Sequence, residues 1–321
     1  MGLFSKYEEP GKGVPKNPDQ KLPLFRFFEL YFAHFTKLIP LNFIYIICFL
    51  PMFGGIILMQ LFIGEDSNLY YIAFYAVVII SGIIIGPATC GVAKLTRNMS
   101  IEKPIFLWHD FWETFKTNFK QGAIMGIIDM LFISAVSVSF PMYYNMATSS
   151  NIFYIPFALC LICSVLFLMM HFYIYFLIVT TDLGLWKILK NSFLLTAIDI
   201  KSSIVNLVVT AIVLILVAIF FPYTAILVII LPTFMAFLYA FNCYPVIRKY
   251  VIQPYYDERG ERNPELDYID EDGETVFVDA PELEEAPPKK ESGGILPKRD
   301  KNNTNSVPKS NSSGKRKKTI R

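Results

Sequence analysis

The carboxylate of Asp129 is the most unusual group in this sequence, because it lies within a long apolar run. If that run crosses a bilayer, burying the charge at mid-helix costs about 2.5 to 3.5 kcal/mol, so the side chain needs a polar partner. At about 1.5 Å of rise per residue, Asp129 and His171 lie at a similar depth, roughly 10 Å from the same end of neighbouring runs. We therefore expect these two side chains to meet.

Three asparagines lie towards the same end of other apolar runs and extend this candidate polar cluster. They are Asn42, Asn206 and Asn242. In a functional interpretation, the cluster is an ion or proton relay, or a polar vestibule for a substrate. In a structural interpretation, the same groups form interhelical hydrogen bonds, which contribute about 0.6 kcal/mol per contact on average. The sequence leaves both interpretations open.

A second candidate site is the aromatic stretch from Pro104 to Lys120, in which Trp and Phe alternate with charged residues. Such a stretch suits a cytoplasmic helix that docks a partner protein. It suits equally well a helix anchored at the lipid headgroups, where Trp, Phe and Lys are stabilised. The candidate docking residues are Trp108, Asp110, Phe111, Trp112, Phe115, Asn118 and Phe119.

The familiar signatures of catalysis are missing from the sequence, which contains no GxxxxGK(S/T), GxSxG or HExxH pattern. Cys160 and Cys163 form a CxxC pair, but their apolar surroundings disfavour the thiolates that redox or metal chemistry needs. The three histidines lie in different segments, which argues against a zinc site. We expect no enzymatic activity, no cofactor, no metal and no nucleic-acid partner.

The elements that must position these residues are long apolar segments. Hydrophobic residues make up 54% of the chain, and they gather into runs of about twenty residues, which is enough to cross a bilayer. The sequence therefore predicts an all-α fold, a polytopic membrane helical bundle of about six transmembrane helices. Only Pro222 separates the last two, so this pair is alternatively a broken or re-entrant element. The expected spans are Ile39–Phe62, Leu69–Val92, Gly122–Tyr144, Phe153–Val179, Ile204–Phe221 and Tyr223–Tyr244.

The distribution of Lys and Arg predicts the orientation of the bundle, because basic loops stay on the cytoplasmic side. Every basic residue before the C-terminal tail falls on one side of the six expected spans, while the alternate loops carry only Glu65 and Asp66. We therefore expect a multi-pass protein of the plasma membrane with both termini in the cytoplasm. The basic residues are Lys6, Lys12, Lys16, Lys21, Arg26, Lys37, Lys94, Arg97, Lys103, Lys116, Lys120, Lys187, Lys190, Lys201, Arg248 and Lys249.

Three parts of the chain follow from this pattern: a cytoplasmic leader at 1–21, a membrane domain at 22–253 and a charged tail at 254–321. Within the membrane domain, the stretches 24–37, 106–120 and 185–201 combine aromatic residues with lysine, which predicts interfacial amphipathic helices on the cytoplasmic side. The tail is first acidic and then basic and has no apolar run, so we expect it to be disordered.

Several segments resemble the YesL-like family of bacterial integral membrane proteins, whose molecular function is not established. They are MGLF, LNFIYIICFLP, GPATCGVAKLTRNMSIEKPIFLWHDFWETFKTNFKQG, TTDLGLWKILKNSF and FNCYPVIRKYVI. The most specific part is the DF…F…NF pattern formed by Asp110, Phe111, Phe115, Asn118 and Phe119. The resemblance implies a protein of a Gram-positive plasma membrane that works beside sugar-import ABC systems.

The first functional hypothesis is thus a noncatalytic accessory or permease-like component of carbohydrate ABC import, whose partners are the lipid bilayer and ABC transporter subunits. A second is a self-contained transporter or channel that uses the intramembrane polar cluster. A third is a membrane scaffold that acts through its tail. The sequence names neither a substrate nor an oligomeric state.

Overall fold

The computed structural model describes residues 22–63 and 68–268, all of which belong to one compact unit. Within these ranges the regular structure is entirely helical, which confirms the predicted all-α membrane bundle. The α-helices are α1 (Pro23–Ala33), α2 (Phe35–Ile47), α3 (Leu50–Phe62), α4 (Asn68–Ser100), α5 (Leu107–Thr117), α6 (Phe119–Ser149), α7 (Tyr154–Thr180), α8 (Leu185–Ile198), α9 (Ile200–Ile219), α10 (Leu231–Ile247) and α11 (Gln253–Asp257). Short 3₁₀ helices lie at Asn151–Phe153, Tyr223–Ile229 and Pro264–Tyr268, and a π-helical turn at Arg248–Ile252.

Five helical segments in the described ranges are long and apolar enough to cross a membrane: Phe35–Phe62, Leu69–Ser100, Phe119–Ser149, Asn151–Thr180 and Ile200–Ile219. They correspond to the first five expected spans. The first consists of α2 and α3, which are separated at Cys48 and Phe49 just before the proline in the first turn of α3. The second continues past Val92 to Ser100.

The sixth expected span, Tyr223–Tyr244, differs from the other five. Its first part is a 3₁₀ helix, and its second part is α10, which has 17 residues and begins with a proline in its first turn. The broken element considered from the sequence therefore describes this region better than one continuous span. Proline favours the first turn of a helix because it has no N–H, and an N–H at that position would have no intrahelical acceptor.

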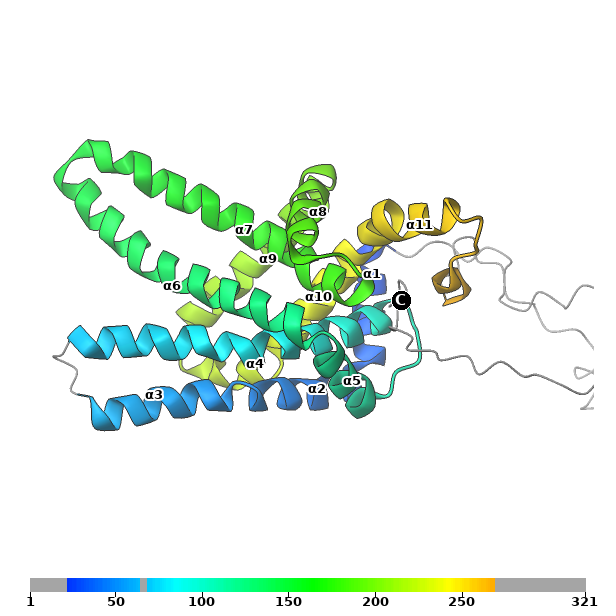
Figure 1. Ribbon diagram of the computed structural model, residues 1–321, viewed down its shortest axis with the longest axis horizontal. Helices are drawn as coiled ribbons and strands as arrows, with labels where there is room; N and C mark the ends of the chain where they lie inside the picture. Colours follow the sequence, from blue (N-terminus) through cyan, green and yellow to red (C-terminus); the bar gives the residue numbers. More distant parts are fainter. Residues whose placement is uncertain (1–21, 64–67, 269–321) are drawn as a thin grey trace, which may run out of the picture. The chain divides into compact units, whose positions relative to one another are not determined.

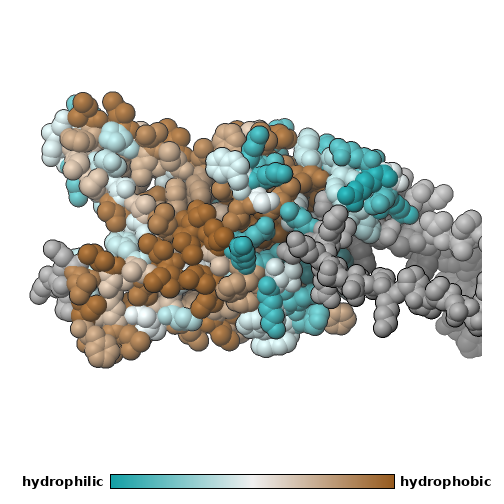
Figure 2. All heavy atoms as spheres, in the orientation of Figure 1, coloured by the Kyte–Doolittle hydropathy of each residue, from teal (hydrophilic) through white to brown (hydrophobic). Residues whose placement is uncertain are grey.

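The two ends of the bundle differ in character. Figure 1 shows the α6–α7 turn at one end and α1, α5, α8 and α11 at the other. Hydrophilic residues gather at the end with the short helices, while the spans are largely hydrophobic (Figure 2). This arrangement matches the separation of basic and non-basic loops in the sequence. Which end faces the cytoplasm stays a prediction.

The centre of the bundle is a close contact between α4 and α6. Gly82 and Gly86 of α4 face Gly122 and Gly126 of α6, and a Cβ added to Gly86 would stand 2.0 Å from the carbonyl oxygen of Gly122. Small residues four positions apart allow two membrane helices to approach until their backbones touch. The sequence carries this GxxxG spacing twice, so the contact could have been predicted from it.

The predicted interfacial helix at 24–37 is more deeply integrated than expected. Phe27 and Tyr31 of α1 are buried, and their rings pack against Phe234 and Phe237 of α10, with centroids 5.3 to 5.8 Å apart. The opposite face of α1 leaves apolar side chains exposed, including Phe32. One side of this helix thus belongs to the core, and the other is free to meet lipid.

The folded part of the chain extends beyond the expected domain boundary at residue 253. Residues 254–268 include most of α11 and a final 3₁₀ helix, and both Asn263 and Glu265 are buried. The expectation of disorder is therefore wrong for this part of the tail, because its polar groups find buried partners. The leader at 1–21 and the tail from 269 onward lie outside the described residues.

Candidate functional site

Asp129 meets two side chains of the neighbouring helix α7. Its Oδ2 accepts a 2.6 Å hydrogen bond from the hydroxyl of Tyr175, and its Oδ1 lies 3.6 Å from Nδ1 of His171. Tyr175 follows His171 by four positions, so one face of α7 presents both groups to α6. Asp129 is only 6% exposed, and its Oδ1 has no hydrogen-bond partner.

These groups lie at a cavity of about 410 Å³ between α6 and α7. Most of its wall is apolar, and the two serines in it each donate to a carbonyl of their own helix, Ser137 to Ser134 and Ser164 to Cys160. Asp129 and His171 are therefore the two ionisable residues at this cavity, and its surface is almost entirely apolar. The lining residues are Asp129, Phe132, Ile133, Val136, Ser137, Ser164, Phe167, Leu168 and His171.

Asn42 belongs to a different contact, between α2 and α10. Its Oδ1 accepts the backbone N–H of Thr233 at 3.0 Å, and its Nδ2 donates to the Thr233 hydroxyl and to the carbonyl of Ile230. The first N–H groups of a helix have no intrahelical partner. Asn42 therefore caps α10 from a helix nearly two hundred residues earlier in the chain, which is a structural role.

Asn206 and Asn242 form a third group, between α9 and α10. The amide of Asn242 donates to Oδ1 of Asn206 at 2.6 Å, and the amide of Asn206 donates to Sγ of Cys243 at 3.0 Å. The hydrogen bonds of the described residues thus divide the five candidate cluster residues into three separate groups. Of these groups, the Asp129–His171 pair lines the cavity.

The candidate docking residues on and beside α5 divide between surface and core. Trp108 is 65% exposed and Phe119 is also exposed, whereas Phe111 and Asn118 are buried. The Phe111 ring lies so close to Gly91 of α4 that an added Cβ there would stand 2.6 Å from it. Phe111 consequently holds α5 against α4, and the buried side chain of Asn118 donates to the carbonyl of Thr114 within α5, so neither is exposed to a partner. Asp110, Trp112 and Phe115 are partly buried.

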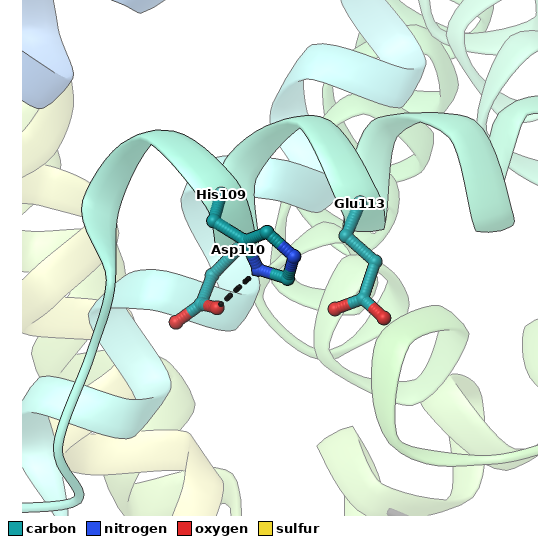
Figure 3. A group of neighbouring side chains, drawn as sticks. All are labelled: His109, Asp110 and Glu113. Atoms are coloured by element: carbon teal, nitrogen blue, oxygen red, sulfur yellow. Dashed lines mark hydrogen bonds and ion pairs between the residues drawn. The ribbon is translucent and has the colours of Figure 1, made fainter.

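Three side chains of α5 have the spacing of a metal site in the described part of the chain: His109, Asp110 and Glu113 (Figure 3). Each carboxylate has another partner. Asp110 accepts the backbone N–H of Phe106 at 2.9 Å, and Glu113 lies 3.5 Å from the ammonium of Lys94. His109 and Glu113 are also exposed. The expectation of no metal stays a prediction, and these partners explain the clustering without an ion.

A buried ion pair, which the sequence did not suggest, joins the C-terminal segment to α4. The guanidinium of Arg97 pairs with Glu265 and lies 4.7 Å from the ring centroid of Tyr244, whose hydroxyl donates to Glu265. Asn263 accepts the backbone N–H of Glu265 and donates to Gln253. Many sequences contain a basic residue near the end of a helix and an acidic residue far along the chain. Such a pattern therefore does not predict the Arg97–Glu265 pair.

The comparison with protein families gives one finding for the centre of the bundle. Residues 67–140 match the model of a family described as protein of unknown function, DUF624. The matched segment begins just before α4 and ends within α6, so it contains the glycine contact, α5 and Asp129. The match is consistent with the resemblance to the YesL-like family. No curated protein and no solved structure matches the chain. Together with the five apolar spans, these observations identify an integral membrane protein.

Proposed function

We propose that this chain is a noncatalytic accessory protein of the plasma membrane, with both termini in the cytoplasm, that works beside a carbohydrate ABC importer. The YesL-like resemblance suggests the importer. The observation that favours an accessory role over a sugar conduit is the chemistry of the α6–α7 cavity. A sugar carries many hydroxyl groups, and each one buried without a partner costs about 1 to 3 kcal/mol. A cavity whose surface is almost entirely apolar would not compensate that cost.

The exposed part of α5 is the surface we assign to the importer. Trp108 projects from a helix that Phe111 fixes to α4, so the indole is presented from a rigid base. Tryptophan residues on rigid elements are frequent anchors of protein interfaces. Lipid headgroups also accommodate such a residue, and the experiment below separates the two roles.

The test is capture of the tagged full-length protein from its native membranes in a mild detergent, with mass spectrometry, in cells grown with and without sugar. We expect ABC transporter subunits with the wild type and at least a fivefold smaller recovery with Trp108→Ala. Trp186→Ala is the matched control, because Trp186 of the short helix α8 is also an exposed tryptophan, with 81% of its surface exposed. Recovery of no transporter subunit under either condition, or an equal loss with both variants, would refute the proposal.

A self-contained transporter is the second candidate, and the buried Asp129–His171 pair between α6 and α7 favours it. Carboxylates and histidines inside membrane helices often belong to ion or proton pathways. Uptake of radiolabelled sugars and cations into liposomes containing the purified protein tests this role. Uptake that Asp129→Asn abolishes would support it, whereas no uptake of any of these solutes would argue against it.

A further inference from the structure

Helix α8 connects two membrane spans, because the fourth span ends at Thr180 and the fifth begins at Ile200. Both ends of α8 are therefore held near one boundary of the bilayer. In Figure 1 the helix lies across the direction of α4 and α6 and does not continue either span. One face of α8 belongs to the core: Ile188 and Leu195 are buried, and the hydroxyl of Ser192 donates to the carbonyl of Ile188.

The opposite face of α8 changes in character along the helix. Lys187 and Lys190 are exposed in its first half. In its second half the exposed side chains are apolar: Phe193, Leu194 and Ile198 are 45 to 52% exposed. Residues three or four positions apart lie on the same side of a helix, so the lysines and the apolar patch adjoin one another. Lysines beside an apolar patch are typical of helices that lie between acyl chains and headgroups.

The positive charge of this face is not compensated within the described part of the chain. Helix α8 contains no Asp or Glu. Neither Lys187 nor Lys190 forms an ion pair with another described residue. The acids nearest in sequence lie outside the helix: Asp182 precedes it, and Asp199 accepts the backbone N–H of Ser202 at 3.5 Å. The two lysines are thus available to an anion outside the bundle.

The other two expected interfacial helices differ from α8 in this respect. In α1, the carboxylate of Glu29 lies 3.7 Å from the guanidinium of Arg26. In α5, Asp110 and Glu113 provide negative charge on the same helix. Their basic groups therefore have acids close by, whereas the lysines of α8 do not. The charge pattern selects α8 as the helix that favours an anionic lipid.

We propose that α8 binds an anionic phospholipid, with the negative headgroup at the ammonium groups of Lys187 and Lys190 and an acyl chain along Phe193, Leu194 and Ile198. A zwitterionic lipid offers the same phosphate but adds a positive group, which the lysines repel. Near an anionic surface, each lysine strengthens the attraction by about fivefold in affinity. This binding does not depend on the proposed importer, because it uses α8 and not α5.

Photocrosslinking of the full-length protein, reconstituted into phosphatidylcholine vesicles, tests the proposal. The probes are phosphatidylglycerol and phosphatidylcholine, each with a diazirine at the same acyl position and added at the same small fraction. Mass spectrometry after chymotryptic digestion, whose sites the lysine substitutions leave unchanged, measures the labelling of residues 185–201. We expect at least fivefold more labelling of this segment in the wild type by the phosphatidylglycerol probe than by the phosphatidylcholine probe.

Paired lysine variants separate charge from fold. Lys187→Gln/Lys190→Gln should reduce labelling by phosphatidylglycerol at least fivefold, whereas Lys187→Arg/Lys190→Arg, which keeps the charge, should stay within twofold of wild type. Lys116→Gln/Lys120→Gln is the matched control, because these two lysines are also exposed but lie on and beside α5. It should leave the labelling of 185–201 unchanged.

Four results would overturn the proposal. They are equal labelling of 185–201 by the two probes, labelling of the α8 glutamine variant within twofold of wild type, an equal loss in both glutamine variants, and a loss in the arginine variant as large as in the glutamine variant. Absence of labelling in the wild type would also overturn it and would indicate that another partner, such as the acidic part of the tail, covers the lysines.

Discussion

The hydrogen bond from Tyr175 to Asp129 shows how one side chain makes a buried carboxylate tolerable. Hydrogen bonds to charged groups contribute about 1.5 to 3 kcal/mol, roughly twice the value of neutral ones. Tyr175 supplies this bond at 2.6 Å, while the second carboxylate oxygen keeps only the more distant His171. Tyr175 therefore provides the main compensation for burying this carboxylate.

Removal of the Tyr175 hydroxyl should destabilise the protein measurably. We expect Tyr175→Phe to lower the free energy of unfolding by about 1.5 to 3 kcal/mol, because both oxygens of Asp129 would then lack a hydrogen bond. Thermal unfolding of the purified protein in detergent measures the change. Tyr173→Phe is a control on the same helix: it loses a neutral bond to Ser203 and should cost about 1 kcal/mol. Equal losses in the two variants would contradict the special role of Tyr175.

At the scale of elements, the α4–α6 contact depends on glycine at particular positions rather than on apolar character. Main-chain atoms of the two helices touch where Gly82, Gly86, Gly122 and Gly126 face one another. A side chain there must push the helices apart, because a backbone carbonyl cannot rotate out of the way.

We therefore expect Gly86→Ala to destabilise the bundle by about 1 to 3 kcal/mol or more, the usual range for overpacking. Gly54→Ala is the matched control, because nothing lies within 4 Å of a Cβ added at that position. The yield of monodisperse protein in size-exclusion chromatography and the midpoint of thermal unfolding compare the two. If Gly86→Ala were as stable as Gly54→Ala, the contact would be looser than the structure indicates.

The junction of α1 and α2 should respond to pH through His34. Partial burial and the nearby Lys37 lower the pKa of His34, and Glu102 and a hydrogen bond with Met99 oppose them only in part. The folded protein then binds fewer protons at His34 than the unfolded chain, so stability falls as the pH drops through the ordinary histidine value of about 6.5. His34→Gln should flatten the dependence of the unfolding midpoint on pH between about 5 and 7. A slope unchanged in this variant would assign the dependence to other groups.

At the scale of the whole molecule, the C-terminal segment is held to the bundle by one buried charge pair. Arg97 is 2% exposed and Glu265 is 5% exposed. Breaking a buried pair leaves one charge uncompensated and costs about 3 to 5 kcal/mol. We expect Glu265→Ala to cause a loss of this order and to speed proteolysis after residue 252. Glu261→Ala, at an exposed position, should leave both properties unchanged; similar behaviour of the two variants would refute the role of the pair.

Length and hydropathy were sufficient to predict five of the spans, because crossing a bilayer needs about twenty apolar residues whatever their packing. They could not predict the irregular sixth region, since its interruption depends on contacts such as the Asn42 cap on α10. Depth along a helix predicted that Asp129 and His171 are neighbours. Depth does not give the rotation of a helix about its axis, so it wrongly grouped Asn42, Asn206 and Asn242 with this pair. For the same reason it did not separate buried Phe111 from exposed Trp108.

The position of Glu265 also affects how deletion experiments should be interpreted. A scaffold role for the tail would ordinarily be tested by truncating the chain where the last apolar run ends, near Tyr256. That cut removes the partner of Arg97 and would damage the bundle itself, so a lost phenotype would say nothing about the tail. Truncation after Tyr268 keeps the pair intact. Only that shorter deletion can distinguish a missing tail from a misfolded membrane domain.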